Sequence, residues 1–232
     1  MLTAAVRLHF FPSTYFPSLL LTGNACAPPP QLDLPALPVS PIDLPLDRLA
    51  AALGAPGGPP PLFVGAVPAL GDVVVVLRDA EAVRAAFGFF FAPPEPLAAR
   101  SQVRAARPDF GALASLLPAP PAGRGVCITA AGGAGAGELA SVDFSSRWFA
   151  PRGGLVGTGS EDSTTGTAHC YLAPLWASRL GKSRVEAAQL SPRAGRLACV
   201  VSAASRVALL GACVCTLKGE VVAQPPAANM VP

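Results

Sequence analysis

Residues 165–180, TGTAHCYLAPLWASRL, decide the expected fold of this chain. A helix built from this stretch carries apolar side chains on nearly every face, whereas a surface helix carries them on one stripe. Such a helix is buried, so we expect a sheet wrapped around it. Pro174 lies in its middle and has no N–H, so we expect the helix to kink there, or to end near Ala173 and restart.

The rest of the chain reads mainly as short strands. We expect strands at 32–38, 62–67, 71–77, 125–130, 140–149, 184–190, 196–202, 206–210 and 212–217. We expect shorter helices at 44–53, 79–86 and 110–117. One long apolar helix among many strands is an α+β pattern and not an alternating α/β pattern.

Composition excludes several classes of protein. The 232 residues are 51% hydrophobic and 13% charged, which rules out a polar disordered chain. The formal net charge of +3 is small and the basic residues are scattered, so nucleic acid is not an expected partner. The longest purely aliphatic stretch, Val73 to Leu77, is far too short to span a membrane.

Cysteine usage bears on the compartment. The six cysteines form neither a C-x-x-C pair nor a disulfide framework, so we expect free, mostly buried thiols and no metal site. A cytoplasmic location follows from this expectation. Residues 1–32 contain no acid, which is a feature of transit peptides, so a plastid or mitochondrion is the alternative.

The chain is divided by proline, glycine and a duplicated tetrapeptide. Residues 55–61, APGGPPP, have the composition of a linker. The sequence VRAA occurs at 83–86 and again at 103–106, so we interpret residues 87–106 as an insertion in a surface connection. The expected units are therefore 1–61, 62–224 and a tail at 225–232.

Residues 157–169, GTGSEDSTTGTAH, are the part of the chain whose residue types indicate a binding or catalytic site. Free N–H groups and the positive end of the helix dipole meet in the first helical turn, around Gly166 and Thr167, where a substrate carboxylate can dock. Asp162 lies beside this turn and is able to act as a general acid or base. The structural alternative is that Asp162 only caps the helix and the glycines form a loop.

His169 and Cys170 suggest a Cys–His nucleophile, but adjacent residues on a helix do not face each other. No spacing rule joins Ser160, Asp162 and His169 into a triad. We therefore expect His169 to be a satisfied core histidine.

Several motifs follow one another in a fixed order. They are LDLPA (32–36), DFSSRWFAP (143–151), EDxxTGTAH (161–169), LW (175–176), RLGK (179–182), QxSxRxG (189–195) and LKGE (217–220). Together they resemble the phenazine-biosynthesis PhzF-like isomerase/epimerase family. The resemblance implies a diaminopimelate-epimerase-like fold, in which two similar α+β domains each wrap a mixed sheet around a central helix and the active site lies between them.

The resemblance also implies an activity: isomerisation without a cofactor, by moving a proton between carbons of a small carboxylate metabolite. Asp162 would be the acidic residue of the second domain. Gly166 and Thr167, where the family usually has Gly-Ser, would hold substrate oxygen through a backbone N–H and a hydroxyl.

The chain departs from the family's pattern in several places. The family's proton-shuttling Glu, in a Ser-Glu-Thr-x-Phe stretch, and its Gly-His-Ala motif have no counterpart before Leu32. Ser163 and Ala194 stand where the family has Pro and Gly. The resemblance therefore implies a complete second domain at 62–224, a remnant of the first at 1–61, and an isomerase that is weak or inactive.

Two other interpretations stay open. The chain is alternatively a non-catalytic metabolite-binding or interaction module, a homodimer that covers the surface where a first domain would lie. The duplicated VRAA also fits an incomplete copy of a full-length enzyme.

Overall fold

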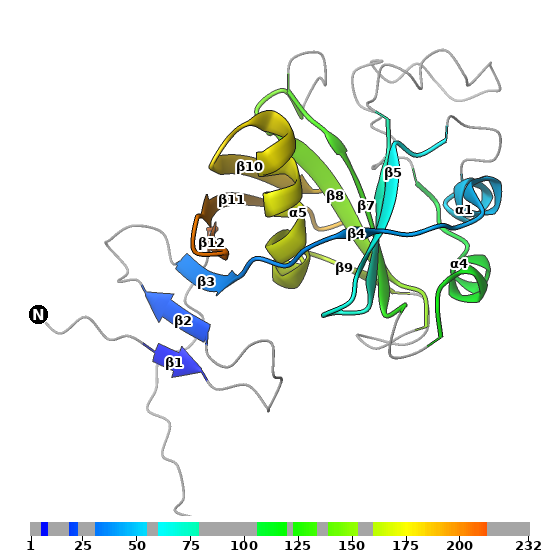
Figure 1. Ribbon diagram of the computed structural model, residues 1–232, viewed down its shortest axis with the longest axis horizontal. Helices are drawn as coiled ribbons and strands as arrows, with labels where there is room; N and C mark the ends of the chain where they lie inside the picture. Colours follow the sequence, from blue (N-terminus) through cyan, green and yellow to red (C-terminus); the bar gives the residue numbers. More distant parts are fainter. Residues whose placement is uncertain are drawn as a thin grey trace, which may run out of the picture.

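A large mixed sheet curls around one long helix in the computed structural model (Figure 1). The structure describes residues 6–8, 19–22, 31–54, 60–78, 106–119, 123–133, 139–152 and 160–212. Its helices within these ranges are α1 (Leu46–Ala52), α4 (Phe110–Leu116) and α5 (Gly166–Leu180). The mixed sheet around a central helix confirms the expected α+β, diaminopimelate-epimerase-like fold class.

The strands are short, and most neighbours are antiparallel. Their bounds are β1 (Val6–Leu8), β2 (Leu19–Thr22), β3 (Gln31–Pro35), β4 (Ser40–Pro41), β5 (Phe63–Val67), β6 (Asp72–Val76), β7 (Gly125–Ala131), β8 (Phe144–Ala150), β9 (Ser160–Asp162), β10 (Arg184–Gln189), β11 (Gly195–Ser202) and β12 (Arg206–Leu210). Their order in the sheet is β1-β2-β3-β12-β11-β10-β8-β7-β6-β5-β4, with β9 beside β8. The pairs β6–β7 and β8–β10 are parallel.

The elements expected from the sequence lie close to their predicted positions. Strands predicted at 184–190, 196–202 and 206–210 are β10, β11 and β12, and the helix predicted at 110–117 is α4. The strand predicted at 140–149 begins later, at Phe144, because residues 139–142 form a turn closed by the hydrogen bond from Val142 N–H to the Leu139 carbonyl.

Some predictions fall on residues outside the described ranges. These are the helix at 79–86, the linker residues 55–59, residues 87–105 of the insertion, residues 213–217 of the last strand and the tail at 225–232. Strands β3 and β4 belong to the same sheet as the strands after residue 62. The origin of residues 1–61 as the remnant of another domain stays a prediction.

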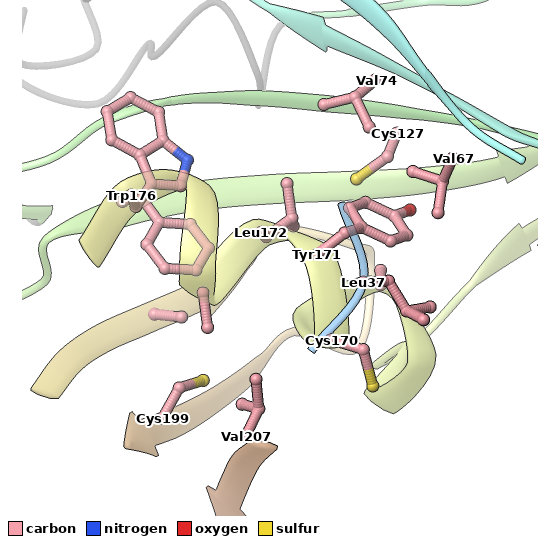
Figure 2. Close-up of a cluster of buried hydrophobic side chains, with 14 of the residues drawn as sticks. Leu37, Val67, Val74, Cys127, Cys170, Tyr171, Leu172, Trp176, Cys199 and Val207 are labelled. Atoms are coloured by element: carbon pink, nitrogen blue, oxygen red, sulfur yellow. The ribbon is translucent and has the colours of Figure 1, made fainter. Parts of the chain in front are cut away.

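Helix α5 is buried along most of its length, as its apolar sequence predicts. Its buried residues are Ala168, His169, Cys170, Tyr171, Leu172, Ala173, Trp176 and Ala177. Figure 2 shows Tyr171 and Leu172 among side chains from distant segments, including Leu37, Val74 and Cys127. Burial of a side chain such as Leu172 contributes about 2 kcal/mol to stability. No helix within the described ranges is long and apolar enough to cross a membrane.

A four-residue connection joins two distant parts of the sheet across α5. Strand β3 pairs with β12 and β4 pairs with β5, at opposite ends of the run of strands around the helix. Only residues 36–39 separate β3 from β4, and they pass alongside α5 in Figure 1. Leu37 is buried against the helix, and its N–H donates to the Cys170 carbonyl at 2.9 Å. The helix is therefore enclosed by sheet and connection together.

One of the two outcomes predicted at Pro174, a helix that ends near Ala173 and restarts, is wrong. Helix α5 runs without a break from Gly166 to Leu180, with Pro174 inside it. Proline cannot donate to the carbonyl four residues earlier, which here belongs to Cys170. Because Leu37 N–H bonds that carbonyl, the group that proline leaves free is satisfied inside the core. The helix therefore neither ends at Ala173 nor restarts.

The two faces of the sheet have separate cores. Along β6, Val74 and Val76 pack in the core that contains α5, whereas Val73 and Val75 pack in the core beneath α1 and α4. All five residues of β6 are buried. This two-sided burial explains why the sequence of β6 is continuously apolar after Asp72 and does not alternate.

Asp72, at the start of β6, is a buried carboxylate that ties the sheet to α5. Arg124 donates to both of its oxygens, at 2.9 and 2.8 Å. The Trp148 indole N–H and the Tyr171 hydroxyl each donate to Oδ2 at 3.0 Å. Burial, together with the nearby carboxylate of Asp72, raises the pKa of Tyr171, so its hydroxyl keeps the proton that it donates. No local sequence pattern indicates this network.

We predict that Asp72→Ala lowers the free energy of unfolding by about 3 kcal/mol, because it leaves the buried Trp148 and Tyr171 donors without an acceptor. The matched control is Asp33→Ala, which removes the carboxylate of an ion pair with Arg206 whose side chains are 43% and 41% exposed. The control should lose less than about 1 kcal/mol. Urea unfolding measures both, and equal losses would contradict the buried network.

Candidate functional site

Strands β9 and β10 lie end to end along one edge of β8. Strand β9 is antiparallel to β8, with Asp162 opposite Trp148. Strand β10 is parallel to β8, with Gln189 opposite Ser146. Because the two directions are opposed, the carboxyl ends of β9 and β10 meet. This geometry brings Asp162 beside Gln189, a residue far from it in sequence.

Gln189 links the ends of the two strands and the start of α5. Its side chain is fully buried. Its Nε2 donates to the Asp162 carbonyl at 2.8 Å and to Thr165 Oγ1 at 3.1 Å, and its Oε1 accepts from Thr165 N–H at 2.7 Å. Ser191 Oγ adds a bond to the Ser163 carbonyl at 2.7 Å. The loop that carries Asp162 is therefore fixed by buried hydrogen bonds.

The Asp162 side chain does not cap α5. The N-cap residue is Thr165, and its side chain makes no capping bond to the helix backbone. Asp162 is partly buried, and its Oδ2 accepts a hydrogen bond from Thr165 Oγ1 at 2.7 Å. Asp162 is therefore not the N-cap of α5, but it accepts a hydrogen bond from the residue that is.

Gly166 and Thr167 form the first turn of α5, beside Asp162, and both are partly exposed. The first N–H groups of an α-helix have no acceptor within the helix and lie at the positive end of its dipole. A Cβ atom at Gly166 would meet nothing closer than Leu209 Cδ1, at 3.8 Å. Gly166 therefore leaves space beside the partly exposed first turn.

Glu161, the neighbour of Asp162, lies on the opposite face of the sheet. Its carboxylate accepts two hydrogen bonds from the Arg147 guanidinium, at 2.6 and 2.8 Å. The side chains of this ion pair are only 9% and 13% exposed. They line a hollow of about 370 Å³ together with Ala106, Arg107, Pro108, Phe110 and Phe149. Asp162 does not line this hollow.

His169 is a buried, neutral base in the second turn of α5. Its Nδ1 lies 2.8 Å from the Thr165 carbonyl, so Nδ1 carries the proton and donates it. Burial lowers the pKa of this imidazole. Its Nε2 has no hydrogen-bond partner among the described residues. Burial also raises the pKa of Cys170 to about 12, so the thiol does not act as a nucleophile.

The structure adds two residues to the three candidates taken from the sequence. Asp162, Gly166 and Thr167 lie at one end of α5, and Thr165 and Gln189 organise them. Gln189 belongs to the QxSxRxG motif at 189–195, but the sequence pattern does not indicate its role. The available signal was a glutamine that follows two alanines, Ala187 and Ala188, at the end of a strand, where a buried amide needs several partners.

The turn between β10 and β11 packs against residues 163–165, the loop between Asp162 and α5. A Cβ atom at Gly195 would lie 2.3 Å from Thr164 Oγ1, so any larger residue at position 195 would collide with this loop. Ala194, beside it, has a φ of 55°, which is left-handed and costs an L residue roughly 1–2 kcal/mol. A glycine at this position would carry no such cost.

The part of the chain that contains the candidate site matches a known protein family. The model of the phenazine biosynthesis-like protein family (PhzC-PhzF) matches residues 96–219, more than half of the chain. An uncharacterized isomerase of Pseudomonas aeruginosa is 42% identical over 125 residues, which cover 54% of this chain and 41% of that protein. The mouse phenazine biosynthesis-like domain-containing protein 2 is 39% identical over 100 residues, covering 43% of this chain and 33% of that protein.

A solved structure shares the fold. The crystal structure of a PhzF-family phenazine biosynthesis protein from Enterococcus faecalis superposes with a TM-score of 0.60 and 31% sequence identity. The match covers 84% of this chain and 57% of that one. The chain thus spans between a third and three fifths of the length of these proteins.

We predict that Ala194→Gly raises the free energy of unfolding by about 1 kcal/mol, because glycine adopts the left-handed conformation without strain. Ala203→Gly, in the turn between β11 and β12, is the control. Among the described residues, left-handed non-glycine backbone occurs at Ala194 and Ser205 but not at Ala203. The control should leave the free energy of unfolding unchanged or lower it. Urea unfolding measures both variants, and a loss of stability in Ala194→Gly would contradict the prediction.

We predict that the His169 imidazole titrates below 6.5, its ordinary pKa, because burial disfavours its charged form. The unfolded chain then binds a proton that the folded chain does not. The contribution of His169 to stability is therefore complete above pH 6.5 and is lost as the pH falls below it. The chain has only two histidines, so His169→Gln assigns the NMR signal. A midpoint at or above 6.5 would overturn the burial argument.

Proposed function

The chain belongs to the phenazine biosynthesis-like (PhzC-PhzF) family, and on that premise we propose that it carries a proton-transfer site for a small carboxylate metabolite, with Asp162 as the acid or base. The relatives in this family include proteins named as isomerases. The observation that carries the proposal is the position of Asp162. Its carboxylate is oriented by Thr165 at the open first turn of α5.

Each part of the site suits one step of an isomerisation. The first N–H groups of α5 bind the substrate carboxylate at the positive end of the helix dipole. The Thr167 hydroxyl adds a hydrogen bond to a substrate oxygen. Asp162 removes a proton from one carbon and returns a proton to another, which needs no cofactor provided that the carboxylate reaches both positions.

We further propose that the chain by itself is a weak isomerase. Glu161, the adjacent acid, faces the other side of the sheet and is neutralised by Arg147. Asp72, the buried acid on the α5 side, is occupied by Arg124, Trp148 and Tyr171. Asp162 therefore works without help from either carboxylate, whereas a proton shift between two distant carbons is easier with two acid/base groups.

The same geometry supports a second candidate function, a metabolite-binding module that performs no chemistry. An open helix N-terminus binds a carboxylate whether or not a proton is transferred. The engagement of Glu161 and Asp72 elsewhere favours this alternative. Binding and proton exchange must therefore be measured separately.

We predict slow deuterium incorporation when the chain is incubated in D2O with a dihydro-hydroxyanthranilate-type carboxylate, followed by mass spectrometry. Asp162→Asn should abolish the incorporation and keep binding, measured by calorimetry, because the amide cannot exchange the proton and the helix N–H groups remain. Loss of a general acid or base lowers a rate by about 10²–10⁴-fold.

The matched control is Glu186→Gln, a carboxylate-to-amide change at a side chain that is 45% exposed and lies on β10. It should leave incorporation unchanged. Binding without incorporation by the unaltered chain supports the metabolite-binding alternative, and rapid turnover contradicts the proposed weakness. Incorporation that survives Asp162→Asn contradicts the role of Asp162.

A further inference from the structure

The backbone fixes the orientation of the Gln189 amide. Its Oε1 lies 2.7 Å from Thr165 N, and its Nε2 lies 2.8 Å from the Asp162 carbonyl oxygen. A backbone N–H only donates and a carbonyl only accepts. A flipped amide would place two donors together at one contact and two acceptors together at the other. The Gln189 amide therefore has one possible orientation.

This orientation determines where the Thr165 hydroxyl proton points. Gln189 Nε2 also donates to Thr165 Oγ1, at 3.1 Å, so Oγ1 is the acceptor in that bond. A hydroxyl has a single proton to donate. Thr165 Oγ1 lies 2.7 Å from Asp162 Oδ2 and donates its proton there. The hydrogen bonds therefore run in one direction, from Gln189 through Thr165 to Asp162.

We propose that Gln189 is a positioning residue: acting through Thr165, it occupies Oδ2 of Asp162 and leaves Oδ1 as the oxygen that exchanges the proton with substrate. Among the described residues, Oδ1 accepts no hydrogen bond. This inference rests on the proposed function, because it takes Asp162 to be the acid or base.

The physical benefit is orientation. A partly exposed carboxylate on a short side chain rotates freely unless one oxygen is bound. Catalysis is sensitive to such displacement, since a misplacement of about 1 Å costs as much as 10²-fold in rate. Gln189 is fully buried on a strand of the central sheet, so the orientation of Asp162 is set by a rigid element and not by a loop.

The test is NMR of the full chain with 13C-labelled aspartate at pH 7, in which Asp162→Asn identifies the Asp162 carboxyl signal. Thr165→Val keeps the shape of the side chain and removes the hydroxyl, so the signal should move. Thr165→Ser keeps the hydroxyl, so the signal should stay at its original position. Gln189→Glu turns the donor into an acceptor that competes for the Thr165 proton, so the signal should move again.

The double variant decides whether Gln189 acts through Thr165. If it does, combining Gln189→Glu with Thr165→Val moves the signal no further than Thr165→Val alone. Where a buried carboxylate prevents folding, Gln189→Met replaces Gln189→Glu. It removes the Nε2 donor that directs the Thr165 hydroxyl toward Asp162, so the signal should again move only while that hydroxyl is present. The inference is overturned if Thr165→Val leaves the signal in place, or if the change at Gln189 moves it equally with and without the Thr165 hydroxyl.

The deuterium-incorporation assay separates this inference from the proposed function. Thr165→Val and Gln189→Glu should lower kcat by about 10-fold or more with a smaller effect on KM, and Thr165→Ser should restore kcat. Incorporation without the NMR pattern overturns the positioning role and leaves the proposed function standing. The NMR pattern without incorporation or binding overturns the proposed function and leaves the directed hydrogen bonds standing.

Discussion

The hydrogen bond between Leu37 N–H and the Cys170 carbonyl allows α5 to cross the interior unbroken. Pro174 leaves that carbonyl without its usual partner in a buried core, where an unsatisfied carbonyl costs about 1–3 kcal/mol. The connection at residues 36–39 supplies the missing donor and joins β3 to β4 over the helix. The first turn of α5 is therefore placed firmly at the ends of β9 and β10, where the site is built.

Two buried polar side chains attach α5 to the sheet at different points. Asp72 accepts the Tyr171 hydroxyl and fixes the middle of the helix, while Gln189 accepts Thr165 N–H and fixes its start. Each of the two makes several hydrogen bonds, which offset the cost of burying a polar side chain. For the proposed function, this means that Asp162, the proposed acid or base, is held in place through hydrogen bonds that begin on a strand of the sheet.

The adjacent acids Glu161 and Asp162 show how a strand gives two similar groups different roles. Alternate residues of β9 face opposite sides of the sheet. Glu161 is therefore neutralised by Arg147 beside the hollow near α4, and Asp162 faces the α5 side. The family match at residues 96–219 includes β9, α5, β10 and β11 together. The family match thus covers all the elements that surround Asp162 and not one motif alone.

The sequence alone determined the burial of α5, most of the strands around it, though not β4 or β9, and the position of Asp162, Gly166 and Thr167 at one helix end. These features depend on apolar periodicity and on residues close together in the chain. The tertiary structure decided the rest: the continuity of α5 through Pro174, the role of Gln189 and the network around Asp72. These bonds join residues far apart in sequence, separated by 24 positions for Gln189 and Thr165 and by 99 for Asp72 and Tyr171. Only the pairing of strands in the sheet brings such groups within hydrogen-bonding distance. A local sequence pattern does not predict which distant residues will form these bonds.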